Sequence, residues 1–352
     1  MLKPHSLLPL FEKFIAHSRT GRRLNKNGTR IKPQTVENYS YCLKLLEEYS
    51  AYRHTELVLY EIKGNDKREH AMLKKYWDKF YRQFTDYMYR QKKCHDNYTG
   101  QNIKMIRTFF NWINDSCGIA TGPHHKNFYI QKEEIAIITL TVEQLRFLMF
   151  DNDFEAKLSR PLKHAKDVFV LGCMVGLRFS DLCKIKKENI ELRDSGHYLK
   201  MRSQKTGTDT LVKLPAPAMD ILERYKKNKG TLLPVVSLFR FNKNIKKLAE
   251  LAGWTYPLPR LRTRKGIKSQ SQHNTLTPTR FCDALSSHTM RRTSITTMLT
   301  SGMPEYVVRK ISGHTSDSKA FFRYVSLAQS LMDKEIEKMH VHFEERALVH
   351  TA

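Results

Sequence analysis

Apolar side chains recur every three or four positions along the first third of the chain, with polar side chains between them. This spacing places the apolar residues on one face of a helix and predicts four amphipathic helices between residues 6 and 119. Helices of this kind bury their apolar faces against one another, so we expect a small helical bundle. The four apolar stripes span residues 7–15, 36–46, 73–87 and 103–113.

The pattern changes after Gly118, Gly122 and Pro123, which interrupt the helical rhythm and indicate a linker. Thr141 and Gln144 then form a capping box that starts a new helix. The apolar run at 168–177 fits a buried helix or a buried strand, and the preceding KHAKD, which lacks turn residues, favours the helix. Further on, ENIELRDSGHYLKMRSQKTGTDTLVKLP changes period to two. Its turn-rich DSG and QKTGTD segments predict three short strands in an antiparallel meander.

These changes predict a multidomain, mostly α protein. An all-α domain occupies residues 1–119 and a linker follows at 120–139. A mixed domain, mostly helical with a small sheet, occupies residues 140–345, and a short tail spans 346–352.

The charge of the chain indicates what kind of partner it binds. The chain has 61 Lys and Arg against 35 Asp and Glu, a formal net charge of +26 spread along most of its length. Such an excess is typical of a folded surface that binds nucleic acid. Two polar segments, GRRLNKNGTRIKP and PLPRLRTRKGIKSQSQHN, read as basic loops that contact DNA phosphates, although the first alone fits a solvated loop equally well. Their basic residues are Arg22, Arg23, Lys26, Arg30 and Lys32 in the first, and Arg260, Arg262, Arg264, Lys265 and Lys268 in the second.

Other classes of function are disfavoured by the same composition. No apolar run reaches the roughly 18 residues that a membrane span needs, and the first residues make a poor signal peptide. The six cysteines lie far apart with no C-x-x-C pair, so we expect reduced thiols and no metal site.

The residues from Ser286 to Val325 combine an apolar helical rhythm with charged and imidazole side chains. His288, Arg291 and Ile295 recur at spacings of three and four, which places Arg291 on the same face as core residues. An unpaired guanidinium there is costly, so we expect it to face a cleft that holds an anion.

Two further side chains follow this helix. Gly313 closes a helix that starts near Pro304, and this holds His314 at a helix end. Tyr324 lies ten residues later on a further helix, so that its phenol and the imidazole can meet at one site. Tyr306 is a rival for Tyr324, but it precedes the histidine and lies on a different helix.

Upstream segments add to the same chemistry. GLRFSDL contains Arg178 and Asp181, and the QKTGTD turn contains Lys205, with Lys200 and Lys213 as rivals on the same meander. Arginine, histidine, lysine and tyrosine without a metal suit phosphoryl transfer. Guanidinium groups can hold the nonbridging oxygens, and a phenol can form a phosphotyrosine ester that conserves the energy of a phosphodiester. Neither a metal nor ATP is then required as a cofactor.

H-x-x-R-R-T at 288–293, G-H at 313–314 and the tyrosine that follows resemble the second conserved box of the tyrosine recombinases, the phage integrase family. GLRFSDL resembles the first box, and the similarity covers most of the chain. SSHTMRRT and ISGHTS are most similar to mobile-element integrases of the Bacteroides group. The resemblance implies an all-α, SAM-like core-binding domain that clamps DNA, followed by an α+β catalytic domain of the DNA breaking-rejoining type.

The resemblance also implies roles for single residues. Tyr324 would attack the scissile phosphate and form a 3′-phosphotyrosyl link, while Arg178 and Arg291 would clamp the nonbridging oxygens. His288 would act as general base or hydrogen-bonding partner in that attack, and His314 would hydrogen-bond the phosphate.

Two residues complete the implied set. Lys205 would protonate the departing 5′ oxygen. Asp181 would support the geometry of Arg178 and His288.

By the same resemblance, the protein would be a site-specific recombinase or integrase of a mobile element or prophage, in the bacterial cytoplasm and at the nucleoid when bound. Its partners would be double-stranded DNA with inverted-repeat core sites, three further copies in a homotetramer that assembles from monomers, and accessory DNA-bending or directionality factors. The last helical stripe, at 332–343, would pack on its own core or dock on a neighbouring protomer. A type IB topoisomerase and a catalytically silent DNA-binding regulator are the alternatives.

Overall fold

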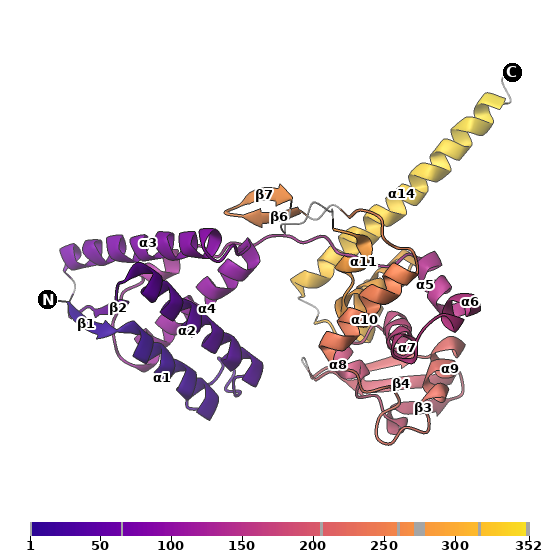
Figure 1. Cartoon of the computed structure of the whole chain (residues 1–352), viewed down its shortest axis with the longest axis horizontal. Coiled ribbons are helices and arrows are strands. Elements are labelled where there is room, and N and C mark those ends of the chain that lie inside the picture. Colours follow the sequence, from indigo (N-terminus) through magenta and orange to yellow (C-terminus); the bar gives the residue numbers. More distant parts are fainter. Residues whose placement is uncertain are drawn as a thin grey trace. The chain divides into compact units, whose positions relative to one another are not determined.

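A computed structural model of the chain describes residues 2–64, 66–204, 207–258, 261–270, 279–315 and 318–349. The described chain is mostly helical with small antiparallel sheets, as predicted, and it divides into two units (Figure 1). The first unit contains Met1–Ile135 together with the hairpin of strands β6 and β7, and the second unit contains the remainder. Within the described residues, no helix is both long enough and apolar enough to cross a membrane.

Four helices form most of the first unit, at the positions of the four apolar stripes. Their shared core is aromatic. Phe11 and Phe109 lie 4.7 Å apart between ring centroids, and Trp77 meets the ring of Phe110 edge to face at 4.8 Å. The helices are α1 (Leu7–Thr20), α2 (Pro33–Arg53), α3 (Lys67–Arg90) and α4 (Asp96–Ser116).

A short pair of strands in this unit is absent from the sequence prediction. Strand β1 (Lys3–Ser6) pairs antiparallel with β2 (Val58–Glu61), and His5 Nε2 lies 2.8 Å from the carboxylate of Glu61. Four residues per strand are too few for an alternating pattern to stand out from the helical stripes beside it. The 3₁₀ turn η1 (His124–Asn127) follows α4.

The second basic segment was expected to be a loop, but its described part forms a hairpin. Strands β6 (Leu261–Arg264) and β7 (Ile267–Gln270) pair antiparallel. The two turn residues, Lys265 and Gly266, have φ angles of +54° and +77°, as two-residue hairpin turns require. Their backbone N–H groups donate to the carboxylate of Asp96 at 2.8 and 3.0 Å. The hairpin therefore packs with the first unit, although it lies within the stretch that the sequence assigns to the second domain.

A buried ion pair holds the same hairpin. The guanidinium of Arg262 donates to the carboxylate of Glu133 from Nε and Nη2, with a shortest distance of 2.7 Å, and the backbone N–H of Thr263 donates to it at 2.7 Å. The Glu133 side chain is 1% exposed. Burial raises the pKa of Glu133, but the hydrogen bonds from Arg262 and Thr263 outweigh burial and hold that pKa below its usual value.

The second unit combines helices with the predicted meander. Strands β3 (Ile190–Arg193), β4 (Gly196–Arg202) and β5 (Asp209–Lys213) pair antiparallel in sequence order. The apolar run at 168–177 forms the buried second half of helix α7 (Arg160–Val175), as preferred from the sequence. The helical elements of this unit are α5 (Val142–Phe150), α6 (Asn152–Ala156), α7 (Arg160–Val175), α8 (Phe179–Leu182), η2 (Lys187–Asn189), α9 (Ala216–Arg224), α10 (Leu238–Leu251), α11 (Phe281–Ala284), α12 (Ser287–Thr300), α13 (Glu305–Ser312) and α14 (Lys319–Val349).

Helices α7 and α12 approach each other closely enough to require glycine. A Cβ atom on Gly172 would lie 2.3 Å from Met290 Sδ. Gly176 ends α7 with a φ of +68°, and a Cβ there would lie 3.0 Å from Ser294 Oγ. This packing brings the carbonyl of Gly176 next to the side chain of Arg291 on α12.

Candidate active site

Four of the six predicted catalytic residues gather where several elements of the second unit meet. Arg178 is the N-cap of α8 and Arg291 lies on α12, while His314 follows Gly313, the C-cap of α13, and Tyr324 lies on α14. Nη2 of Arg291 is 3.3 and 3.4 Å from the two ring nitrogens of His314, and the rings of His314 and Tyr324 are 6.0 Å apart between centroids. A Cβ on Gly313 would lie 3.9 Å from Arg178 Nη1, which places this arginine beside the same turn.

Arg291 is a buried cation, 5% exposed, as its position among core residues predicted. Its Nη1 donates to the carbonyl of Gly176 at 2.8 Å. Within the described residues it forms no ion pair with a carboxylate. Burial, followed by the nearby charge of Arg178, lowers the pKa of Arg291 to about 10. An added anion would therefore be stabilised strongly here.

Arg178 is oriented by a residue that the sequence analysis missed. Its Nη1 donates to Ser203 Oγ at 2.9 Å, and this hydroxyl donates to Asp181 Oδ2 at 3.2 Å. The backbone N–H of Gln204 donates to the other carboxylate oxygen, also at 3.2 Å. Asp181 is 2% exposed, so this buried carboxylate holds Arg178 through Ser203 and also fixes the backbone of Gln204. A lone serine at the end of a strand gave no signal of this link.

His314 is held tightly on several sides. Gly313 adopts a φ of +61°, and a Cβ there would lie 2.9 Å from Thr208 Oγ1, so only glycine fits this turn without displacement. The imidazole packs edge to face on Phe321 at 5.3 Å between centroids. Burial, then the charges of Arg291, Arg178 and Arg309, lower the pKa of His314 to about 3. The imidazole is thus neutral at pH 7 in the free protein.

Tyr324 lies beside this cluster, and its rival does not. It is half-buried against Phe321 and the imidazole of His314, on the helix that the sequence predicted. Its phenol is also close enough to Arg291 to influence the pKa of that guanidinium. Tyr306, on α13, is 74% exposed. Geometry therefore favours Tyr324 as the residue that a bound phosphate would meet.

The two remaining predicted catalytic residues are not seen in this cluster. His288 is exposed in the first turn of α12, one helical turn before Arg291. Lys205 lies outside the described residues, in the connection between β4 and β5. Of its rivals, Lys200 pairs with Glu191 at 3.1 Å.

The first predicted DNA-binding segment is an ordered loop between α1 and α2. Its basic side chains differ in environment: the guanidinium of Arg23 lies 4.4 Å from the ring centroid of Phe14 and donates to Ser18 Oγ at 3.1 Å. This arginine is therefore part of the packing of the bundle. The exposed members of the set are Arg22, Lys26, Arg30 and Lys32.

The second predicted DNA-binding segment is largely engaged within the protein. Arg262 pairs with Glu133, Arg264 Nη2 donates to the carbonyl of Lys93 at 2.8 Å, and the ammonium group of Lys265 pairs with Asp86. The expectation of free phosphate ligands therefore does not fit these three side chains. Arg260 lies outside the described residues, and Lys268 lies on β7.

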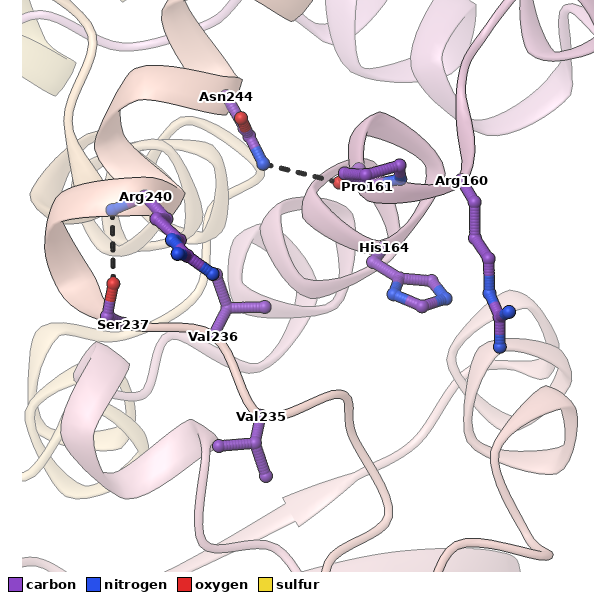
Figure 2. Close-up of a pocket in the computed structure, with 8 residues that line it drawn as sticks. All are labelled: Arg160, Pro161, His164, Val235, Val236, Ser237, Arg240 and Asn244. Carbon is purple, nitrogen blue, oxygen red and sulfur yellow. Dashed lines mark hydrogen bonds between the residues drawn. The ribbon is translucent and has the colours of Figure 1, made fainter.

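A hollow in the second unit lies away from these residues. This cavity of about 510 Å³ is bordered by the first turns of α7 and α10, and the predicted catalytic residues are absent from its lining (Figure 2). Arg160, His164 and Arg240 border it, and Asn244 donates to the carbonyl of Pro161 at 3.4 Å across one edge. Among the described residues, no three or more His, Cys, Asp or Glu side chains gather as a metal site.

Comparisons with known proteins point to one family. The sequence model described as the phage integrase family matches residues 152–330. A λ integrase dimer bound to a COC′ core site superposes with a TM-score of 0.55 at 16% identity, over 92% of this chain and 95% of that one. The Tn1549 transposon integrase with circular intermediate DNA gives 0.56 at 16%, over 94% and 99%. A λ integrase tetramer on a Holliday junction gives 0.53 at 17%, over 90% and 79%. Among curated protein sequences, none matches this chain.

Proposed function

The chain belongs to the phage integrase family, whose model covers more than half of it, and we propose that Tyr324 and the cations beside it form its DNA-cleaving site. As a family member it is a site-specific recombinase, an enzyme that transfers DNA strands. One observation carries the assignment: the buried guanidinium of Arg291 has no carboxylate partner among the described residues and lies in a cluster with Arg178, His314 and Tyr324.

The proposed reaction is an in-line displacement at a DNA phosphodiester. The phenolic oxygen of Tyr324 forms a bond to phosphorus as the bond to the 5′ oxygen breaks, which leaves a 3′-phosphotyrosyl ester. A 5′ hydroxyl of the recombining strand then attacks that ester, so the bond to the tyrosine breaks and the phenol is regenerated. Arg178 and Arg291 stabilise the charge on the nonbridging oxygens in both steps.

Protons move through two further residues in this scheme. His288 accepts the phenolic proton of Tyr324, and Lys205 donates a proton to the departing 5′ oxygen. Asp181 supports the site through Ser203, which accepts from Arg178, and through the backbone of Gln204. It thereby positions the clamping arginine and Gln204, the residue before Lys205 in the sequence.

We further propose that the substrate is duplex DNA with inverted-repeat core sites, bound by four copies of the chain. A net charge of +26 supports a polyanionic partner. The matched λ integrase is described as a dimer on a core site and as a tetramer on a Holliday junction. Accessory bending or directionality factors, a mobile element like those of the Bacteroides group, and action at the bacterial nucleoid complete the proposal.

A suicide substrate tests the nucleophile. The duplex is first selected for binding from a random-sequence pool and then nicked near the cleavage point, so that the released fragment cannot return. The wild-type protein should form a covalent adduct on a denaturing gel, and Tyr324→Phe should form none. Tyr306→Phe is the matched control and should react like the wild type. An adduct with Tyr324→Phe would remove that residue from the proposal.

A further inference from the structure

One buried hydroxyl next to the site is not explained by the reaction scheme. Ser312 is the last residue of α13 and is 1% exposed. Its Oγ lies 2.6 Å from the carbonyl oxygen of Val308 and 2.8 Å from Nδ1 of His314. A serine at a helix end commonly bonds to the carbonyl four residues earlier, but the second contact reaches a predicted catalytic side chain.

The positions of the protons follow from what each group can donate. Two oxygens 2.6 Å apart share a proton, and a backbone carbonyl has none, so the Ser312 hydroxyl donates to Val308. The hydroxyl has only one proton. Its oxygen must therefore accept from His314, which places a proton on Nδ1. In a neutral imidazole the other nitrogen, Nε2, then carries the lone pair.

We propose that Ser312 is a positioning residue that sets this tautomer of His314, so that Nε2 is the nitrogen that meets the reacting phosphate. The inference rests on the proposed function, because it assigns a task to a residue of the same site. With Nδ1 committed to the serine, Nε2 is the ring nitrogen left to accept from Arg291, whose Nη2 lies 3.3 Å from Nδ1 and 3.4 Å from Nε2. When a phosphate arrives, the guanidinium can turn to its oxygens, and Nε2 can take up a proton and donate to them.

The groups around the ring support these different roles of Nδ1 and Nε2. Arg291 from α12, Arg178 from the start of α8 and Arg309 from α13 are the cations that act on the imidazole, and Tyr324 faces it from α14. These three positive charges oppose a second proton until an anion offsets them, and burial adds to that effect. Ser312 is the neutral hydrogen-bonding partner in this shell, which suits a group that must fix a tautomer without adding charge.

Nitrogen NMR of the full-length protein tests the tautomer directly. Histidine labelled with ¹⁵N distinguishes a protonated from an unprotonated ring nitrogen, and the signals missing in His314→Gln identify this residue. The wild type at pH 7 without DNA should show protonated Nδ1 and unprotonated Nε2. Ser312→Ala should show a mixture of tautomers. A wild-type spectrum with the proton on Nε2 overturns the proposal, whether or not the variant folds.

Single-turnover cleavage tests the consequence. Ser312→Ala should slow adduct formation by about 10- to 100-fold, as for other residues that orient a histidine through its second nitrogen. In a His314→Gln background the same substitution should change the rate less than about twofold, because both act through one ring. Ser326→Ala removes a similar hydroxyl-to-carbonyl bond, to Phe322 on α14, and should leave the rate unchanged.

The two proposals fail separately in this design. If Tyr324→Phe abolishes the adduct while Ser312→Ala keeps the wild-type rate and spectrum, the positioning role is rejected and the proposed function stands. If the wild-type protein forms no adduct on any selected DNA, the proposed function fails, and the wild-type spectrum still decides the tautomer.

Discussion

Glu133 and Asp96 in the first unit are buried about as deeply as Arg291 in the second, yet the partners of their charged groups differ. The carboxylate of Glu133 pairs with Arg262, and that of Asp96 accepts hydrogen bonds from two backbone N–H groups of the hairpin and from the Tyr89 hydroxyl. Arg291 and its neighbour Arg178 form no ion pair within the described residues. They bond instead to a carbonyl, an imidazole and a hydroxyl.

The difference separates buried charge used for folding from buried charge kept for function. A buried ion costs several kcal/mol unless a partner offsets its desolvation. In the first unit, groups of the chain itself offset the desolvation of the buried carboxylates. In the second unit, the desolvation of the buried arginines is offset only in part. A buried cation without a carboxylate partner is expected where a bound anion supplies the opposite charge. Here a DNA phosphate would be that anion.

The largest effect is expected at the uncompensated cation. Arg291→Met keeps the side-chain volume and should slow single-turnover cleavage at least about 10²-fold, because a preorganised charge at the transition state is lost. The free energy of unfolding should change by less than about 1 kcal/mol, since the substitution removes both a cation and its desolvation cost. A loss of stability well beyond that, in urea unfolding, would show that the guanidinium has a structural role instead.

Glu133→Gln should do the opposite, lowering the free energy of unfolding and leaving the cleavage rate unchanged. Removal of the carboxylate leaves Arg262 without its partner in a mostly buried position, so the first unit should lose about 2–3 kcal/mol of stability. Urea unfolding followed by tryptophan fluorescence in a Trp254→Phe background reports this unit through Trp77 and Trp112. Adding Arg262→Met to Glu133→Gln should restore part of the loss. No recovery in the double variant would argue that the pair is not the source of the stability.

The pH dependence of the first unit follows from the same pair. The folded state holds the pKa of Glu133 below its usual value, so the folded state binds this proton less readily than the unfolded state. The contribution is fully present above the ordinary glutamate pKa of about 4.3 and is lost as the pH falls through the lowered value. The Glu133→Gln variant should lack that part of the acid destabilisation.

A third effect concerns proton uptake by His314 on DNA binding. Its pKa of about 3 in the free protein keeps the ring neutral at pH 7, and a phosphate would raise that pKa. Binding should therefore take up as much as one proton and strengthen as the pH falls from 7.5 to 6. Titration calorimetry in buffers with different ionisation enthalpies measures this number. His314→Gln should abolish the uptake, and an unchanged value would exclude this residue as its source.

The smallest effects separate exposed from packed basic residues in the first unit. Arg22 is exposed, so Arg22→Ala should lower the slope of log affinity against log salt by about 1 and leave stability unchanged. Arg23 lies over the ring of Phe14, so Arg23→Ala should lower stability by about 0.5–1 kcal/mol. Equal effects of the two substitutions on the salt slope would contradict this distinction.

Structural features that depend on neighbouring residues in the sequence were predictable. The apolar stripes gave the four helices of the first unit, and Thr141 with Gln144 gave a capping box that the structure contains. The H-x-x-R and G-H motifs placed Arg291, His314 and Tyr324 on the right elements, because each motif carries its own turn and helix signals.

Features that depend on distant partners were not predictable in this way. The hairpin at 261–270 read as a basic loop because the carboxylates that hold it, Glu133 and Asp96, lie far upstream in the sequence. Ser203 and Ser312 orient predicted catalytic residues through single hydrogen bonds, and a lone serine has no distinctive spacing. In both cases the missing information was which residue the tertiary fold brings near.

Mapping the covalent link on a trapped suicide substrate shows which residue attacks the DNA. The wild-type adduct is digested with protease and nuclease, and mass spectrometry locates the residue that retains a nucleotide. We expect the nucleotide on Tyr324 of the wild type, and no such adduct from Arg291→Met under the same conditions. A nucleotide on Tyr306 or any other residue, or an equal yield from Arg291→Met, would contradict the claim that the buried cations hold the scissile phosphate beside this tyrosine.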